Sequence, residues 1–172
     1  MRKLKFLDET GTLLNMTRRY GRAEPGERVV ESIPSDYGSN HTLIATLSLD
    51  GIQAPWVFEG ALNGDIFKLY LEEVLGPTLQ PGEILLMDNL SSHKVAGVEE
   101  LVAARGARLE YLSTYSPDYN PIERCWSKIK TYLRRAKART YDALVQAIKE
   151  ALETITESDA RAWFKFCGYS IQ

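Results

Sequence analysis

The stretch Ile84–His93, with the sequence ILLMDNLSSH, constrains the fold of this chain more than any other. Four consecutive apolar residues are typical of a short strand that is buried on both faces, as in a parallel sheet covered by helices. The apolar run ends at Asp88, and in open α/β sheets ligands gather beyond the carboxyl ends of the strands. The pattern therefore predicts an α/β domain with Asp88 at a functional edge of its sheet.

Length and composition indicate a single globular domain. The chain has 172 residues, 44% of them hydrophobic and 26% charged, which is ordinary for a folded protein. Its formal net charge of −2 argues mildly against a dedicated nucleic-acid-binding protein. The two cysteines, Cys125 and Cys167, lie far apart, which favours a reducing compartment and indicates neither a disulfide framework nor a zinc site. No apolar run approaches the roughly 18 residues of a membrane span.

Five strands and a set of helices account for the rest of the chain. Asp50-Gly51 between two apolar runs predicts a hairpin, and Pro55 suits an edge strand. The strands are expected at residues 4–8, 41–49, 52–59, 83–88 and 108–112. The helices are expected from Asn63 to Gly76, from Ser91 or Ser92 to Gly106, from Asn120 through Leu133, from Tyr141 to Ile155, and within residues 158–172. This order predicts a mixed sheet with helices packed on it.

Several side chains have specific expected places in these helices. Asn63 and Asn120 are expected to cap their helices, with Pro121 at the first helical position. Apolar residues at helical spacing predict which faces turn inward. Those expected inward are Ile66, Leu69, Tyr70, Val74, Val95, Val98, Leu101, Val102, Leu144, Ile148, Ala151 and Leu152. Trp56, Trp126 and Trp163 are assigned to the core.

Three carboxylates stand at the predicted ends of elements, and each has a simple structural interpretation. Asp8 would open a turn with Glu9, Thr10 and Gly11. Asp88 would turn the chain out of its strand. Glu123 would complete a capping box, because it follows Asn120 by three residues. Taken singly, each acid favours this structural interpretation.

Taken together, the acids favour a metal site. Clustered carboxylates repel one another, so one becomes protonated unless a cation neutralises them. Mg²⁺ or Mn²⁺ is the natural choice, and two such ions about 4 Å apart activate a water or hydroxyl and stabilise the leaving oxygen of a phosphodiester. No phosphate-binding loop, serine-hydrolase elbow or HExxH motif competes with this interpretation. His93 is open to two interpretations, a partner of Asp88 or a residue at a helix start.

Three motifs carry a family resemblance: FLDETGT around Asp8, LLMDNLSSHK around Asp88 and YSPDYNPIERCWSKIK around Glu123. Together they resemble the catalytic domain of DDE transposases, specifically the bacterial insertion-sequence branch of the mariner superfamily. The 34 residues between Asp88 and Glu123 fit the family spacing. The resemblance covers essentially all of residues 1–172.

The resemblance implies a ribonuclease H-like fold, a mixed five-stranded sheet with helices on both faces. It implies that Asp8, Asp88 and Glu123 hold two Mg²⁺ or Mn²⁺ ions. Asp118 is a rival for a metal role, but the family pattern puts the third acid at Glu123. Supporting roles fall to Asn89, His93 and Asn120. It also implies cut-and-paste transposition, in which the element end is cleaved and its 3′-hydroxyl is joined to target DNA, typically at TA. A homodimer, located with the nucleoid in a bacterial cytoplasm, is expected.

Basic residues in two segments are candidates for DNA contact. Phosphate contacts by such residues supply affinity that is independent of sequence. The candidates are Arg18, Arg19 and Arg22 near the N-terminus and Arg124, Lys128, Lys130, Arg134 and Arg135 after the third acid. The alternative is a solvated helix face.

One departure from the family pattern concerns the N-terminus. Relatives carry a helix-turn-helix DNA-binding region before the first acid, whereas only seven residues precede Asp8 here. We therefore expect that a separately encoded chain supplies end recognition, or that the protein is a remnant. Two other functions stay open: a non-catalytic module for DNA binding or dimerisation, and a ribonuclease H or resolvase-like hydrolase on the same fold.

Overall fold

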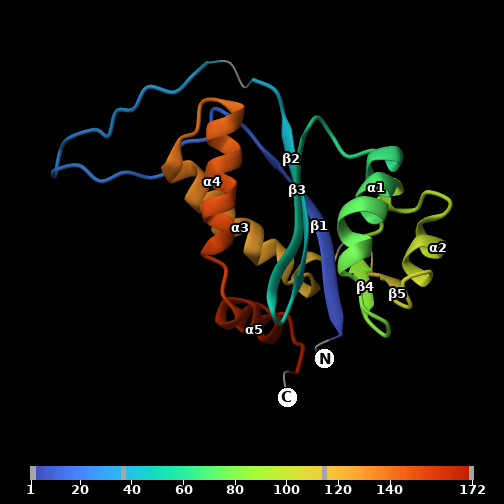
Figure 1. The fold of residues 1–172 in the computed structure, drawn as a ribbon. Coiled ribbons are helices and arrows are strands. Elements are labelled where there is room, and N and C mark those ends of the chain that lie inside the picture. Colours follow the sequence, from blue (N-terminus) through green and yellow to red (C-terminus); the bar gives the residue numbers. More distant parts are fainter. Residues whose placement is uncertain (1–2, 36–37, 114–115, 171–172) are drawn as a thin grey trace.

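A five-stranded mixed sheet forms the centre of the computed structural model, which describes residues 3–35, 38–113 and 116–170 (Figure 1). The strands are β1 (Leu4–Thr12), β2 (His41–Ser48), β3 (Gly51–Glu59), β4 (Ile84–Met87) and β5 (Arg108–Tyr111). They lie in the order β3-β2-β1-β4-β5. The first three strands pair antiparallel, and β4 and β5 continue the sheet from β1 in parallel. The predicted mixed five-stranded sheet is confirmed.

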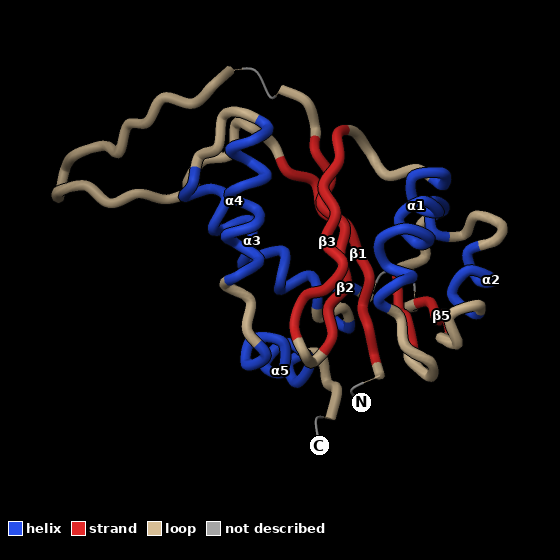
Figure 2. Tube along the Cα trace, viewed as in Figure 1, coloured by secondary structure: helices blue, strands red, loops and turns tan. Residues whose placement is uncertain are grey.

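Helices cover both faces of this sheet, as Figures 1 and 2 show. On one face lie α1 (Gly64–Tyr70) and α2 (Val98–Ala103); on the other lie α3 (Ile122–Ala136), α4 (Tyr141–Glu153) and α5 (Glu157–Phe166). Side chains of β1 alternate between the two layers because successive residues of a strand point to opposite faces. Phe6 packs with the α3–α5 layer, and Leu7 packs with the α1–α2 layer. Asp8 therefore faces α3, and Glu9 faces the opposite layer.

The first strand is longer than predicted. We expected it to end at Asp8, followed by a turn, but β1 continues to Thr12. The reason is its antiparallel partner: β2 pairs with β1 from Phe6 to Thr12, opposite Leu47 to His41. On its other edge, β1 pairs with β4 only as far as Phe6. Asp8 thus lies in the middle of a strand, two residues beyond the point where the parallel neighbour ends its pairing.

The hairpin and its edge strand are confirmed. The turn is formed at Asp50-Gly51, where Gly51 has a φ of 109°. β3 is the edge of the sheet, and its register with β2 shifts between Ile44 and Thr46. Pro55 follows Ala54, which has the positive φ of 50°. Pro55 is therefore accommodated at an irregular stretch of an edge strand, where a missing N–H donor is tolerated.

The helical layer beside α1 departs from the prediction in one side chain. Asn63 caps α1 as expected, accepting a hydrogen bond from the backbone N of Ile66 at 2.9 Å. Beyond α1 the chain continues as a π-helical turn (Leu71–Leu75) and a 3-10 turn (Gly76–Thr78). The changed pitch turns the buried face, which holds Phe67, Tyr70, Leu71 and Leu75. Leu69, predicted to face inward, is 49% exposed.

The helix after β4 starts later than predicted. Neither Ser91 nor Ser92 caps α2; they begin a single 3-10 turn, Ser91–His93. The α-helix begins at Val98, preceded by Gly97 with a φ of 93°, a left-handed conformation that glycine adopts without strain. His93, the last residue of the 3-10 turn, is held by tertiary contacts described below.

The inward assignments on the other helices hold for most residues. Val98, Val102, Leu144, Ile148 and Ala151 are buried. The remaining predicted positions, together with two of the three tryptophans, are partly buried against the two cores: Val74, Val95, Leu101, Leu152, Trp56 and Trp163. Trp126 is 2% exposed.

The 13–40 loop connects β1 to β2, and its described residues, 13–35 and 38–40, extend away from the sheet in Figure 1. Two residues that follow α3 tie this loop down. The Arg139 guanidinium donates to the carbonyls of Leu14 and Met16 at 2.8 and 2.9 Å, and Lys137 forms an ion pair with Glu31. The loop is therefore anchored near the C-terminal end of α3. In the described part of the chain, no helix is long and apolar enough to cross a membrane.

Candidate active site

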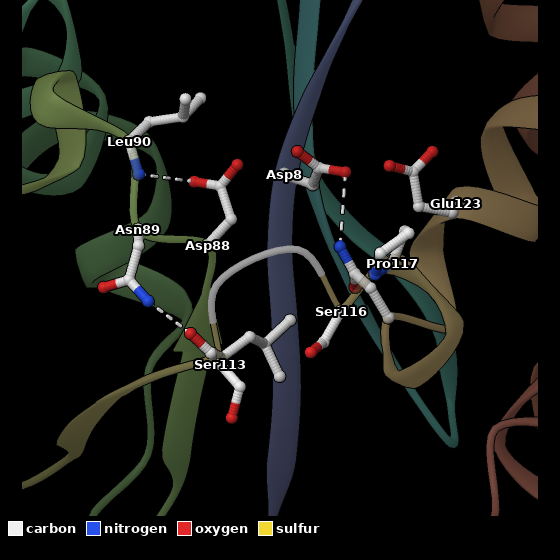
Figure 3. Close-up of a pocket in the computed structure, with 10 residues that line it drawn as sticks. Asp8, Asp88, Asn89, Leu90, Ser113, Ser116, Pro117 and Glu123 are labelled. Carbon is white, nitrogen blue, oxygen red and sulfur yellow. Dashed lines mark hydrogen bonds between the residues drawn. The ribbon is translucent and has the colours of Figure 1, made fainter.

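The three predicted acids line one pocket of about 390 Å³ (Figure 3). They come from three elements: Asp8 from the middle of β1, Asp88 from the residue after β4, and Glu123 from the first turn of α3. In Figure 3, Asp8 lies between the other two. The remaining lining residues are Asn89, Leu90, Leu112, Ser113, Ser116, Pro117 and Asn120. Residues distant in sequence thus meet at the edge of the sheet that the strand pattern indicated.

Asp8 is buried among neutral donors and other acids. It is 8% exposed, and its Oδ2 accepts hydrogen bonds from Trp126 Nε1 at 3.2 Å and Asn120 Nδ2 at 3.4 Å. Burial, followed by the nearby charges of Glu123 and Glu9, raises the pKa of the Asp8 carboxyl to about 8. The fold therefore holds Asp8 where its ionised form is unfavourable unless a cation is added.

Asp88 has the opposite surroundings. Its Oδ1 accepts from the backbone N of Leu90 at 3.1 Å and pairs with His93 Nδ1 at 2.7 Å. Burial alone would raise the pKa of Asp88, but the hydrogen bonds from His93 and Leu90 outweigh it and lower the pKa below its usual 3.8. The bond to Leu90 turns the chain out of β4, as the structural interpretation of Asp88 predicts. Asp88 also lines the pocket.

His93 is fully buried and bridges two carboxylates. Its Nε2 lies 3.1 Å from Glu9 Oε2, and its ring lies 4.6 Å from that of Phe67. Burial lowers the pKa of His93, but hydrogen bonds to Asp88 and Glu9 outweigh this and raise the pKa to about 9. His93 is therefore protonated at neutral pH, and both ring nitrogens donate. Of its two interpretations, the structure supports the partner of Asp88, and it adds Glu9, which the sequence did not single out.

The start of α3 differs from the prediction for Asn120. The asparagine does not cap the helix: Pro121 occupies that position, and no side chain in the described ranges caps α3. Asn120 instead directs its side-chain N–H toward Asp8, with Nδ2 3.4 Å from Asp8 Oδ2. Its Oδ1 is buried without a hydrogen-bond partner among the described residues. Glu123 is exposed and is directed to the pocket (Figure 3), so the capping-box interpretation of Glu123 is wrong.

Two other predicted residues lie at the rim. Asn89 donates from Nδ2 to the carbonyl of Leu112, which ties the end of β4 to the end of β5. Asp118, the rival for the third acid, lies in the 3-10 turn Pro117–Tyr119 and lines a neighbouring pocket. Glu123 lines both pockets.

Two residues near the acids were predicted in other roles, Trp126 in the core and Lys130 as a candidate for DNA contact. Trp126, assigned to the core, is buried as expected but also donates to Asp8. Lys130 is half-buried; burial and Arg134 lower its pKa, while Glu123 and Asp8 raise it. The spacing from Glu123 to Trp126 and Lys130 is helical, which is the signal that could have associated them with the acid.

The predicted basic residues divide between several places. Arg18, Arg19, Arg134 and Arg135 line one groove of about 690 Å³, called the basic groove, although the two pairs are far apart in sequence. Arg22 is exposed in the 13–40 loop and does not line this groove. Lys128 is engaged within the fold, donating to the Thr154 carbonyl and to Asp159 at 2.9 and 2.7 Å. Arg124 stacks on the ring of Phe166.

The donor set of the acid pocket suits a hard cation. It offers carboxylate oxygens and the unpaired buried Oδ1 of Asn120, which are the ligand types that Mg²⁺ and Mn²⁺ prefer. Burial and carboxylate neighbours raise the pKa of Asp8, and a cation would reverse that shift. However, within the described residues no three His, Cys, Asp or Glu side chains are close enough together to hold one ion. The ligand types of this pocket therefore suit Mg²⁺ or Mn²⁺, but the described side chains lie too far apart for three of them to hold one ion.

A family model described as DDE superfamily endonuclease matches residues 3–145. That range contains all three acids and the whole sheet. No curated protein matches the chain.

Solved structures of the Mos1 transposase are similar in fold. The paired-end complex with the left transposon end has a TM-score of 0.72 at 15% identity, covering 97% of this chain and 52% of that one. The catalytic domain with Raltegravir and Mg has a TM-score of 0.71 at 14% identity, covering 97% and 81%. The mariner paired-end complex with Mn has a TM-score of 0.68 at 16% identity, covering 96% and 54%. This chain thus spans about half of the Mos1 chains in the complexes, and the likeness confirms the ribonuclease H-like fold.

Proposed function

The chain belongs to the DDE superfamily endonucleases, and from this we propose that it is the catalytic domain of a transposase that cleaves DNA with divalent metal and transfers the 3′-hydroxyl into target DNA. The observation that carries the proposal is the convergence of Asp8, Asp88 and Glu123 on one pocket from three separate elements. We further propose that it belongs to the bacterial insertion-sequence branch of the mariner superfamily, on the motifs quoted above, and acts on DNA of the bacterial nucleoid.

In this proposal the three acids are the metal ligands. Bound divalent ions would activate the attacking water or hydroxyl and stabilise the leaving oxygen of the phosphodiester. Asp88 is supplied in its ionised form, because the His93 bridge keeps its pKa low. Asp8 is positioned by Trp126 and Asn120, which donate to its Oδ2, while its Oδ1 accepts from the backbone N of Glu9 at 2.9 Å. Glu123 is exposed and has a long side chain, so it can swing toward the other two.

The supporting residues keep these acids in place. His93 orients Asp88 and joins it to β1 through Glu9. Asn89 holds the end of β4 against β5, so that the chain turns out of the sheet at Asp88. Asn120 orients Asp8 and presents an unused oxygen. We infer that these contacts reduce the motion of two acids before DNA arrives.

We propose that the basic groove binds the DNA backbone. Its four arginines come from the 13–40 loop and from α3, the helix that carries Glu123. Burial and the neighbouring Arg19 lower the pKa of Arg134, as expected where cations lie close together. Phosphates would relieve that repulsion, so binding should weaken steeply with salt. Arg22, Arg124, Lys128 and Lys130 complete the proposed set.

The wider assembly is proposed from the family resemblance. Residues 1–172 form one catalytic domain, which acts as a homodimer on element ends and on target DNA, with TA as the target dinucleotide. This chain covers 52% and 54% of the Mos1 chains in the two complexes. We propose that a separately encoded helix-turn-helix chain recognises the element ends.

Cleavage of supercoiled plasmid in Mn²⁺ tests the catalytic proposal. We expect nicking by the wild type and a loss of more than about a hundredfold in Asp8→Asn, Asp88→Asn and Glu123→Gln, because each removes a metal ligand worth several kcal/mol of transition-state stabilisation. Asp142→Asn is the matched control, an acid in the first turn of α4 that should retain full activity. Equal nicking by the wild type and the three variants would refute the proposal.

A second candidate is a non-catalytic module that binds DNA or dimerises. The observation in its favour is the spacing of the acids, since no three potential ligands in the described ranges come together. Calorimetric titration with Mn²⁺ separates the two candidates. Binding that is lost in Asp8→Ala and Asp88→Ala supports the catalytic domain. Heats that are the same in wild type and variants support the module.

A further inference from the structure

A second pocket, of about 280 Å³, adjoins the acid pocket; we call it the side pocket. The two share Pro117, Asn120 and Glu123. The other walls of the side pocket are Asp118, Arg124, Ser127, Phe166 and Cys167. Whatever occupies the acid pocket therefore has the side pocket directly beside it, across the Glu123 side chain.

One wall of the side pocket is a stack of two flat groups. Phe166 is the last residue of α5, and it is 63% exposed, although phenylalanine is usually buried. The guanidinium carbon of Arg124 lies 3.3 Å from the centre of its ring, a close cation–π contact. Since Arg124 follows Glu123 directly, the stack is attached to the helical turn that carries the third acid.

The charges of the side pocket indicate a neutral occupant. Two acids, Asp118 and Glu123, face a single arginine, whose guanidinium already rests on an aromatic ring. Burial raises the pKa of the Cys167 thiol, which keeps it uncharged at neutral pH. A phosphate would find one arginine and two acids here, whereas four arginines line the basic groove. A flat, uncharged group with hydrogen-bond donors on its edge suits these walls.

The side pocket also adjoins the surface that we propose for the DNA backbone. Arg124 and Ser127 continue into a further groove along α3 that includes Arg135, and Arg135 lines the basic groove as well. A strand with one phosphodiester at the acids would follow this exposed side of α3. Its base next to the acids would then lie at the Arg124–Phe166 stack.

We propose that the side pocket receives one unpaired nucleobase of the DNA strand, stacked on Arg124 and Phe166 beside the phosphodiester held at the acids. Bases splayed from a duplex are commonly held by aromatic rings and arginine planes. The inference rests on the proposed function for the identity of the strand. It adds a base-binding residue, Phe166, that lies outside the range matched by the family model.

Equilibrium binding without metal tests the proposal separately from catalysis. Two labelled duplexes are compared in EDTA and low salt: one is blunt, and one ends in a single unpaired 2-aminopurine. We expect Phe166→Ala to weaken binding of the second duplex about 5- to 100-fold and to leave the blunt duplex unchanged. The 2-aminopurine should be quenched by the wild type and bright with the variant. Phe166→Tyr should restore both readouts.

The salt dependence distinguishes stacking from charge. Phe166→Ala should leave the slope of log K against log salt unchanged, whereas Arg124→Ala should reduce it by about one. Tyr141→Ala is the matched control, another exposed aromatic residue, placed at the start of α4. The proposal is overturned if Phe166→Ala binds the unpaired base as the wild type does, if both duplexes weaken equally, or if Phe166→Leu restores quenching. Absent plasmid nicking with intact 2-aminopurine quenching would refute the proposed function alone.

Discussion

Asp8 and Asp88 line the same pocket from neighbouring strands, yet their surroundings are opposite. Asp8 faces the α3 layer, where it is buried, has neutral donors, and has its pKa raised to about 8. Asp88 is half-exposed and paired with the protonated His93, which lowers its pKa. The ionised form of Asp8 is unfavourable in the fold without a cation. Asp88, in contrast, is part of an ion pair that stabilises the fold.

This difference in surroundings means that the two acids contribute differently to stability, although both are proposed to take part in cleavage. A buried carboxylate with no cation beside it destabilises a fold, so its retention at the centre of β1 requires a different benefit. The Glu9–His93–Asp88 bridge, in contrast, supports the structure whether or not a metal binds. Both acids should therefore be needed for cleavage, while their substitutions should move stability in opposite directions.

The bridge gives the largest expected effect. His93→Ala removes two partly buried hydrogen bonds and the contact with Phe67, and it leaves Glu9 and Asp88 without their common cation. We expect a loss of about 3 kcal/mol in the free energy of unfolding, measured by urea denaturation. A loss below about 1 kcal/mol would mean that the bridge contributes little to the fold.

On the other face, Trp126→Phe tests the donors of Asp8. The substitution keeps an aromatic ring in the core but removes the indole N–H that bonds Asp8. We expect a loss of about 2 kcal/mol from the hydrogen bond and the vacated volume together. The comparison variant is Trp163→Phe, a partly buried tryptophan of the same layer, which should cost less.

Asp88→Asn weakens the ion pair while preserving the shape of the side chain. Because Asp88 is 38% exposed, solvent screening reduces the value of the pair, and we expect a loss of about 1 kcal/mol. Chemical denaturation in EDTA measures it without any contribution from bound metal. An increase in stability would contradict the role assigned to the bridge.

Asp8→Asn should have the opposite sign. It removes a buried acid that lies near Glu123 and Glu9, while its new side-chain oxygen can still accept from Trp126. We expect a gain of about 1 kcal/mol, or roughly 2–4 °C in Tm, in EDTA. Added Mn²⁺ should raise the Tm of the wild type and not that of the variant. If both Asp8→Asn and Asp88→Asn destabilise, the two acids are more alike than their surroundings indicate.

The smallest expected effect concerns Asp159, which lies away from the pocket. Like Asp88, it is an acid whose pKa is lowered. Burial would raise the pKa of Asp159, but bonds from Lys128 and Thr156 outweigh it and lower the pKa below 3.8. Its contribution is therefore present above pH 3.8 and lost as the pH falls through the lowered value. Asp159→Asn should cost about 0.5 kcal/mol at pH 7, after allowance for solvent screening. Denaturation curves should show this difference shrinking in acid.

The sequence predicted those parts of the site that local patterns determine. The apolar run before Asp88 and the Asp-Gly turn identified their strands, because burial and turn chemistry act within a few residues. The extent of β1 was wrong because it depends on a partner strand at His41–Ser48. Asn120 fits a helix cap equally well, and only a carboxylate 112 residues away decides its orientation. Trp126 was placed in the core and its donor role missed for the same reason.

The length of β1 beyond Asp8 also bears on how such a domain can vary between relatives. Four further residues pair with β2 before the 13–40 loop begins, so the acid is separated from the loop by a fixed ladder. Lengthening a surface loop carries only a small entropic cost. The loop can therefore gain, lose or exchange segments without displacing Asp8. New contacts with DNA or with other chains can be acquired there while the chemistry at the centre of the sheet is left unaltered.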